Sequence, residues 1–278
     1  MERGKRPAWI AFGGCKYRLL KRKGCHYGST RHRLLPEEHI IYFGDTGRVP
    51  YGSRGREIIR KYAVQDIRFL RRFDVKIIIA ACGTVSSVIT PEIVESAGVP
   101  FSGVVLPAAQ AACAASTNGR IGVIGTAATL RSGAYGRAIR GIRPDAHTFG
   151  NACPLFVPLV ENGFIQPDNE ITIKVAQTYL QPMIENEVDT LILGCTHYPL
   201  IRPVIDRLLR SRVTLIDSGA QVARWAQTLL TREDMLGAGN GGAEYYVSDS
   251  PEMFIETAGI FLGEDVHGNV TQIDLDTL

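Results

Sequence analysis

The stretch "VDTLILGCTH" (residues 188–197) is an apolar, β-branched run that stops at Cys195, and His197 follows two residues later. A short apolar run of this kind is typical of a parallel-sheet strand that is buried on both faces. A second stretch, "VKIIIAACGT" (75–84), repeats the pattern and places Cys82 at the same eighth position. The repetition predicts two similar α/β units, each with one thiol at the carboxyl end of a strand, where parallel sheets bind ligands.

Apolar runs and helical patterns alternate along the rest of the chain. We expect further strands at 39–43, 103–105, 120–125, 213–217 and 243–248. Apolar residues with helical spacing predict helices over 54–72, 171–188 and 218–236. This alternation of strand and helix predicts an α/β fold with mostly parallel sheets.

The charged residues are unevenly distributed. Residues 1–33 hold ten Lys or Arg and one acid, which leaves 21 basic and 27 acidic residues in the remainder, a net charge of −6. The body is therefore mildly acidic, and we expect no nucleic-acid partner. No stretch approaches the roughly 18 apolar residues of a membrane span, so we expect no membrane partner. The six cysteines lack the dense spacing of a secreted scaffold, which favours a reducing, cytoplasmic location.

Several kinds of chemistry could use the two thiols. Zinc sites and redox dithiols commonly use a close Cys-x-x-Cys pair, and the chain has none. A nucleophilic Cys195 with His197 as its base would suit a hydrolase or acyl transferase, but it leaves Cys82 without a role. An acid and a base on opposite faces of a stereocentre would use both thiols, since a thiol can be tuned to either role near neutral pH.

Seven ordered motifs, spanning roughly residues 36–262, carry a family resemblance. They are "YFGDTGRVPYG" (42–52), "AACGTVSS" (80–87), "GRIGVIGTAATLRSGAY" (119–135), "CPLFVPLVENG" (153–163), "LILGCTHYPL" (191–200), "LIDSGAQVA" (215–223) and "YYVSDSPE" (245–252). Together they resemble the glutamate racemases, cofactor-independent enzymes of bacterial cell-wall synthesis.

The resemblance implies two doubly wound α/β domains related by pseudo-twofold symmetry, with the active site in the cleft between them. The first domain would comprise 1–105 and 218–278 and carry Cys82, and the second would comprise 106–217 and carry Cys195. The two thiols would interconvert L- and D-glutamate by proton transfer at the α-carbon, and the product would supply peptidoglycan synthesis. The resemblance implies a homodimer with glutamate as substrate, without cofactor or metal.

The resemblance also assigns further residues to the site. His197 would assist proton transfer at Cys195. Glu161 matches a polar position nearby, but it is explained equally well as a solvated surface carboxylate. The substrate-binding positions are Pro50, Tyr51, Gly52, Gly83, Thr84, Thr126, Thr129 and Thr196. The residues themselves support an anion-binding role for the Gly-Thr-x-x-Thr turn, because a strand-to-helix turn presents N–H groups that favour an anion. Ordinary helix capping is the other reading of that turn.

The chain departs from the family pattern in two places, and the first of them affects the expected activity. The family begins with a strand and a loop that carries Asp-Ser, whose aspartate assists the first cysteine. Here residues 1–35 form an atypical basic leader, and only "IAFGG" (10–14) is a trace of that strand. We therefore expect weak or absent activity. Gly83 stands where the family commonly has Asn, which we interpret as tolerable variation.

Other functions remain open at this stage. The first is a racemase of the same superfamily that acts on aspartate or another small acid. The second is a catalytically impaired amino-acid-binding protein that retains the cleft, and the third is a cysteine hydrolase.

Overall fold

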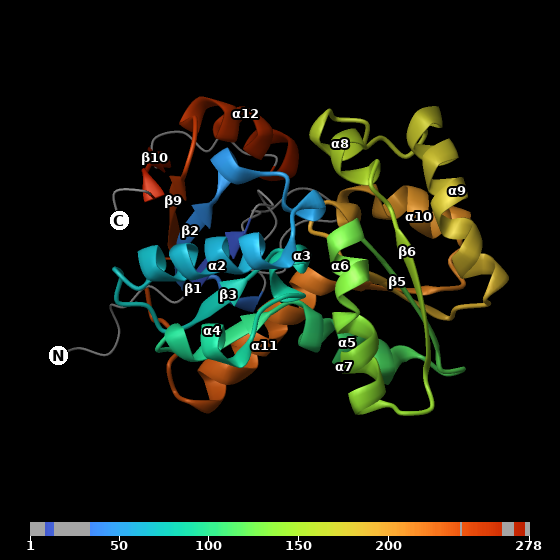
Figure 1. The fold of residues 1–278 in the computed structure, drawn as a ribbon, viewed down its shortest axis with the longest axis horizontal. Helices are drawn as coiled ribbons and strands as arrows, with labels where there is room; N and C mark the ends of the chain where they lie inside the picture. The colour runs from blue at the N-terminus through green and yellow to red at the C-terminus, as the bar shows by residue number, and fades with distance from the viewer. Residues whose placement is uncertain (1–8, 14–33, 240, 263–269, 276–278) are drawn as a thin grey trace.

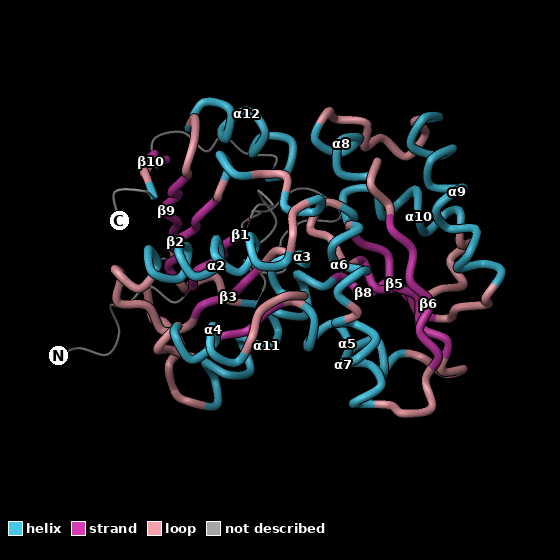
Figure 2. The backbone as a smooth tube through the Cα atoms, viewed as in Figure 1, coloured by secondary structure: helices cyan, strands magenta, loops and turns pink. Residues whose placement is uncertain are grey.

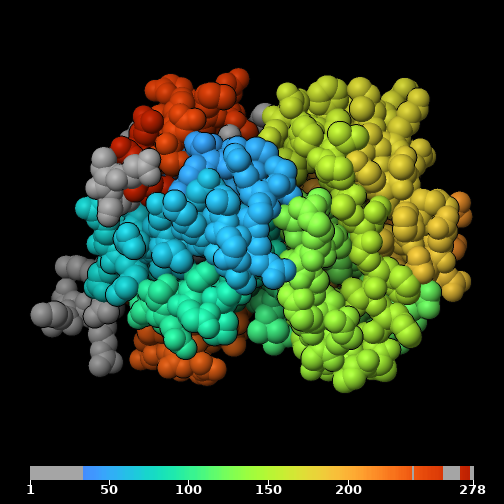
Figure 3. Space-filling view, in the orientation of Figure 1, coloured from blue at the N-terminus to red at the C-terminus, as the bar shows by residue number. Residues whose placement is uncertain are grey.

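The structure, a computed structural model, describes residues 9–13, 34–239, 241–262 and 270–275. Most of the basic leader expected at 1–35 lies outside these residues. Two separate sheets, each flanked by helices, make up the fold (Figures 1 and 2). The elements of the second sheet, coloured green to yellow, occupy one side of the molecule in Figure 3, and the blue and red segments occupy the other.

The first sheet has six strands in the order β10-β9-β2-β1-β3-β4, and every neighbouring pair is parallel. Its strands are β1 (Trp9–Gly13), β2 (His39–Gly44), β3 (Ile78–Ala80), β4 (Phe101–Gly103), β9 (Gly242–Val247) and β10 (Val270–Gln272). The C-terminal strands thus return to pair beside β2.

The second sheet has four strands in the order β6-β5-β7-β8, again all parallel. They are β5 (Arg120–Gly125), β6 (His147–Ala152), β7 (Thr190–Leu193) and β8 (Thr214–Asp217). The expected α/β fold with parallel sheets is confirmed.

Helices connect the strands, as parallel pairing requires. They are α2 (Arg56–Leu70), α3 (Gly83–Ser86), α4 (Pro91–Ser96), α5 (Val105–Ala115), α6 (Ala127–Ser132), α7 (Ala134–Ile142), α8 (Phe156–Glu161), α9 (Glu170–Glu185), α10 (Arg202–Leu208), α11 (Ser218–Arg232) and α12 (Pro251–Leu262). Short 3₁₀ turns are η1 (Thr46–Arg48), η2 (Tyr51–Ser53) and η3 (Tyr198–Ile201). Side-chain caps fix some of the starts, as where the Asp217 carboxylate accepts the N–H groups of Gly219 and Ala220 before α11.

Most expected elements lie within two or three residues of the observed bounds, but the strand expected at 103–105 is wrong. The strand there is β4, and Val105 already begins α5, whose apolar residues recur with helical spacing at Val105, Ala108, Ala109 and Ala112. Val104 and Val105 therefore belong to the start of α5 and not to a strand. The trace "IAFGG" overlaps β1, which pairs with both β2 and β3.

The strands that carry the two thiols occupy matching places. β3 lies between β1 and β4, β7 lies between β5 and β8, and every residue of both strands is buried. Cys82 and Cys195 each follow the last residue of their strand by two positions. Two interior strands of two parallel sheets thus present one thiol each at a carboxyl end, as the sequence predicts.

Candidate active site

The two strand-end loops meet through their backbones. Gly83 follows Cys82, Gly194 precedes Cys195, and a Cβ atom built on Gly83 would clash with the carbonyl oxygen of Gly194. Both thiols are buried, with Cys82 1% and Cys195 2% exposed. The internal repeat thus brings one segment of each sheet to a single point, and only a residue without a side chain fits at position 83.

Three threonine hydroxyls gather beside this contact. The Oγ1 atom of Thr126 lies 2.9 Å from that of Thr84 and 3.0 Å from that of Thr129. Thr126 also caps α6, because its Oγ1 accepts the N–H of Thr129 at 3.3 Å. Gly52 packs against the same side chain, since a Cβ there would lie 2.9 Å from the Thr126 Cβ. The cluster joins η2 and α3 of the first sheet to α6 of the second, and hydroxyls so placed can donate to a carboxylate.

His197 links Cys195 to a carboxylate on another element. Its Nδ1 lies 3.6 Å from the Cys195 Sγ and 3.4 Å from the Thr196 Oγ1, while its Nε2 lies 3.1 Å from the Glu161 Oε1 at the end of α8. An ionised carboxylate only accepts hydrogen bonds, so it holds a proton on Nε2 and leaves Nδ1 able to accept the proton of the thiol. The arrangement can therefore deprotonate and reprotonate Cys195.

Tyr51 belongs to a buried polar network under the first sheet's loops. Its hydroxyl donates to the Asp45 carboxylate, and Arg48 donates from Nε to Asp45 at 2.7 Å and from Nη2 to Asp66 at 2.9 Å. Burial raises the pKa of Tyr51, and the charges of Asp66 and Asp45 act in the same direction. The phenol therefore remains protonated and fixes the loop that carries Gly52.

With this geometry in place, comparison with known proteins identifies the family. The profile of the Asp/Glu/Hydantoin racemase family matches residues 28–226. The chain belongs to this family. Among curated racemases, a glutamate racemase of Geobacter metallireducens is 42% identical over 246 residues, which cover 88% of this chain and 90% of the relative.

Solved racemase structures agree with the fold. A glutamate racemase isoform from Bacillus anthracis superposes with a TM-score of 0.88 at 30% identity, over 98% of each chain. The Francisella tularensis glutamate racemase, solved in complex with D-glutamate, gives a TM-score of 0.87 at 32% identity, over 98% of this chain and 99% of that one. The similarity thus extends over both sheets.

The residues expected at a racemase site come from loops and helix starts of both sheets. Those from the first sheet's loops are Pro50, Tyr51, Gly52, Cys82, Gly83 and Thr84, and those from the second are Thr126, Thr129, Glu161, Cys195, Thr196 and His197. Tyr51 is the exception in orientation, because its side chain points into the Asp45 network while the neighbouring Gly52 faces Thr126. The family's Asp-Ser pair would follow β1, and the residues after Gly13 lie outside the described part of the chain.

Sequence reasoning missed the Asp45, Arg48 and Asp66 network. One signal for it is present, because Asp66 interrupts the apolar stripe of α2 formed by Ile59, Ala63, Ile67 and Leu70. A carboxyl on a core-facing stripe needs a partner and marks a polar network.

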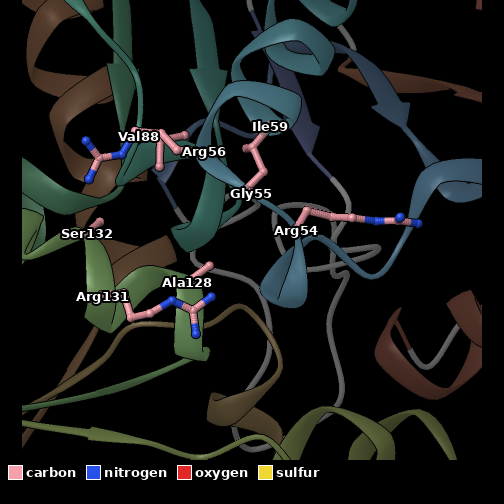
Figure 4. Close-up of a pocket in the computed structure, with 8 residues that line it drawn as sticks. All are labelled: Arg54, Gly55, Arg56, Ile59, Val88, Ala128, Arg131 and Ser132. Carbon is pink, nitrogen blue, oxygen red and sulfur yellow. The ribbon is translucent and has the colours of Figure 1, made fainter.

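A pocket of about 150 Å³ lies beside the site, between the start of α2 and α6 (Figure 4). Its lining residues are Arg54, Gly55, Arg56, Ile59, Val88, Ala128, Arg131 and Ser132. The side chains of Arg54 and Arg56 extend in different directions in this view, and neither thiol lines the pocket. The pocket therefore adjoins the threonine cluster without reaching the reacting groups.

Within the described ranges, no group of three or more His, Cys, Asp or Glu side chains could hold a metal ion. Over the same ranges, none of the helices combines the length and the apolar character that crossing a membrane requires.

Proposed function

We propose that the chain is a glutamate racemase that interconverts L- and D-glutamate with two cysteine thiols and without a cofactor. The observation that carries the proposal is the meeting of the Cys82 and Cys195 loops at Gly83 and Gly194. Family membership and relatives named glutamate racemase over most of the chain support it. The D-glutamate bound in the Francisella structure supports the choice of substrate.

In the proposed reaction, one thiolate removes the α-proton from one face and becomes a thiol. The other thiol then donates its proton to the opposite face of the carbanion and becomes a thiolate. The reverse reaction exchanges the two roles, so the enzyme needs no external acid or base. Removal of this proton is difficult because the adjacent carboxylate is already negative, and hydrogen bonds that strengthen as charge moves onto its oxygens lower the barrier. Thr84, Thr126 and Thr129 would donate such bonds.

His197 and Glu161 would set the protonation state of Cys195. The imidazole accepts the thiol proton when Cys195 must act as a base and returns it afterwards, while Glu161 keeps the ring oriented. Thr196 would contact the substrate beside this thiol.

Further parts of the proposal concern the molecule as a whole. The division into a first domain, 1–105 with 218–278, and a second, 106–217, is supported by the separate membership of strands in the two sheets. A cytoplasmic role in supplying D-glutamate for peptidoglycan is supported by the curated relatives and by the free thiols at Cys113, Cys153 and Cys195. We also propose a homodimer, for which light scattering is the test.

Deuterium uptake tests the activity. When L-glutamate is incubated with the protein in D₂O, deuterium should enter its α-position, and the optical rotation of the solution should fall to zero over the same period. L-aspartate in a parallel reaction separates a glutamate racemase from a relative that acts on another small acid. Thermal stabilisation by glutamate without label uptake would contradict the enzyme and favour a binding protein.

Substitution of each thiol separates the racemase from a hydrolase. Both Cys82→Ser and Cys195→Ser should lower racemisation by at least about 100-fold, because each thiol acts directly on the α-proton. Cys113→Ser is the matched control, since this half-buried thiol lies on α5 away from both strand ends. Retention of activity in Cys82→Ser would contradict the two-thiol reaction.

A further inference from the structure

The pocket between the start of α2 and α6 (Figure 4) is a concentration of positive charge. Three of its eight lining residues are arginines, Arg54, Arg56 and Arg131, and none of the eight is an acid. Residues 34–278 as a whole hold 21 basic and 27 acidic residues, a net charge of −6. The guanidinium groups therefore gather around this pocket against the charge balance of the surrounding protein, and their combined field attracts anions.

These three guanidinium groups are not engaged elsewhere. Within the described part of the chain, none of them makes a hydrogen bond or an ion pair. Glu57, the acid in the first turn of α2, is instead paired with Arg60 at 2.9 Å. The three arginines are exposed, and Figure 4 shows them spread around the pocket. Each long side chain can therefore turn toward a ligand without giving up a described contact.

The start of α2 adds to the attraction for an anion. The helix begins after Gly55, which has no side chain to cap it, and a Cβ atom built on Gly55 would meet nothing within 4 Å. The first helical hydrogen bond at this end runs from the N–H of Ile59 to the carbonyl of Gly55, so the N–H groups of residues 56–58 have no acceptor within the helix. Gly55 and Arg56 line the pocket, which places the positive end of the helix dipole beside the arginines.

The size of the pocket limits what it can hold. Its volume of about 150 Å³ is below the roughly 300–1,000 Å³ of pockets that bind drug-sized ligands, so a ligand as large as a nucleotide does not fit. A phosphate group suits both the size and the charge. It carries about −1.5 to −2 charges near pH 7, and its oxygens accept from several guanidinium groups at once. A carboxylate carries one negative charge and would leave most of the positive charge unbalanced.

We propose that this pocket is a second ligand site, which binds inorganic phosphate or the phosphate group of a small ester and thereby tightens the binding of glutamate. Arg54 and Arg56 belong to elements of the first sheet and Arg131 to α6 of the second, so one bound phosphate joins the two parts. Ser132, which also lines the pocket, donates from Oγ to the carbonyl of Thr129 at 2.6 Å, and this links the pocket to the threonine cluster. The effect on glutamate rests on the proposed function, whereas the binding of phosphate does not.

Titration with inorganic phosphate tests the binding. The full-length chain is titrated by calorimetry, and its Tm is followed, at an ionic strength held constant with chloride. Phosphate should raise Tm in proportion to its occupancy. Arg54→Gln and Arg131→Gln should each weaken the Kd for phosphate by roughly fivefold to tenfold, as expected for loss of one partly exposed hydrogen bond to a charged group.

Two exposed arginines provide matched controls. Arg68→Gln, on the same helix α2, and Arg140→Gln, on α7, should leave the Kd unchanged because neither residue lines the pocket. Equal weakening by the controls would mean that phosphate responds only to surface charge. Binding that survives both Arg54→Gln and Arg131→Gln, or no binding beyond that of chloride, would mean that the pocket is not the site. Each of these results overturns the proposal.

Methyl phosphate separates the two sources of the phosphate group. Binding as tight as that of inorganic phosphate would assign the pocket to small phosphate esters, and binding at least about tenfold weaker would assign it to the free ion, since an added methyl group then does not fit.

The affinity for glutamate tests the effect on the neighbouring site, and calorimetry measures it without turnover. Saturating phosphate should tighten glutamate binding roughly threefold in the native chain and leave it unchanged in Arg131→Gln, which is a modest coupling between two sites. An affinity that does not respond to phosphate in a chain that binds phosphate would overturn this effect. A chain that shows the coupling but does not label glutamate in D₂O would contradict only the proposed function.

Discussion

The Sγ of Cys195 lies 3.6 Å from the Nδ1 of His197, and both side chains are buried. The two residues are separated by Thr196 alone, so the backbone turn after β7 fixes this pairing before any contact with the first sheet. Cys195 and His197 are thus a local unit, whereas the position of Cys82 relative to them depends on how the two sheets pack.

His197→Asn should lower kcat by roughly 100-fold with little change in KM, because it removes the group that exchanges a proton with Cys195 but leaves the threonine cluster intact. Glu161→Gln should have a smaller effect in the same direction, since the Glu161 side chain is 37% exposed and water can partly replace it. His147→Asn, on the exposed part of β6, is the control. Steady-state rates in both directions check this, and a His197→Asn enzyme with normal kcat would contradict the role.

Thr126→Val keeps the shape of the side chain but removes the hydroxyl that joins Thr84 to Thr129. We expect KM for glutamate to rise roughly fivefold to tenfold through loss of one hydrogen bond to the carboxylate. The free energy of unfolding should also fall by about 1 kcal/mol, since the cap of α6 is lost. Thr178→Val, on the exposed face of α9, should change neither quantity. An unchanged KM with the stability loss alone would show that Thr126 is only a helix cap.

Gly13→Asp should raise racemase activity, which we expect to be weak in the native chain. Gly13 ends β1, and the preceding residue Phe12 pairs with Ala80, two residues before Cys82. We expect a carboxylate at this strand end, at the same edge of the sheet as Cys82, to exchange a proton with that thiol. Turnover of the two proteins compared under identical conditions is the measurement. Family-typical turnover in the native chain would contradict the expectation that the missing aspartate limits it.

Asp189→Asn should lower stability in a pH-dependent way. Partial burial acts to raise the pKa of Asp189, but the N–H groups of Asn118 and Thr117 and the hydroxyls of Ser116 and Thr117 outweigh it and lower the pKa from 3.8 to about 2. A depressed pKa in the folded state stabilises the fold above pH 3.8, and this contribution is lost as the pH falls toward 2.

At pH 7 the substitution should therefore cost about 1 kcal/mol, after a discount for solvent screening, and lower Tm by roughly 2–4 °C. The difference between the two proteins should shrink as the pH approaches 2. Denaturant unfolding at pH 7, 4 and 3 measures it, with Asp168→Asn as the control for an exposed aspartate. A difference that grows on acidification would contradict the assigned contacts.

The sequence predicted the parts of the fold whose pattern is local. Buried strands such as β5 and β7 are continuous apolar runs, and the equal placement of Cys82 and Cys195 identified the two units. It missed β6 and β10, since the first carries Gly and polar residues on a half-exposed edge and the second has only three residues. A strand at a sheet edge is partly exposed, so its sequence need not contain the continuous apolar run by which buried strands are recognised.

At the site, sequence reasoning predicted the reacting groups that we propose but missed part of their surroundings. His197 and Cys195 are neighbours in the chain, and the threonine pair lies within one turn, so spacing alone was informative. The contact of Glu161 with His197 spans 36 residues, and the sharing of Arg48 by Asp45 and Asp66 depends on how η1 packs on α2. Such contacts are set by tertiary packing, and they leave no periodic pattern of residue types in the sequence from which they could be predicted.

The glycine that follows Cys82 has a consequence for how far apart the thiols stand. A Cβ atom at this position would clash with the carbonyl oxygen of Gly194, so the two backbones come this close because Gly83 has no side chain. Even the side chain of alanine at position 83 would meet this oxygen, so one of the two loops would have to move. If both thiols act on one carbon atom as we propose, their separation depends on a side chain that is absent.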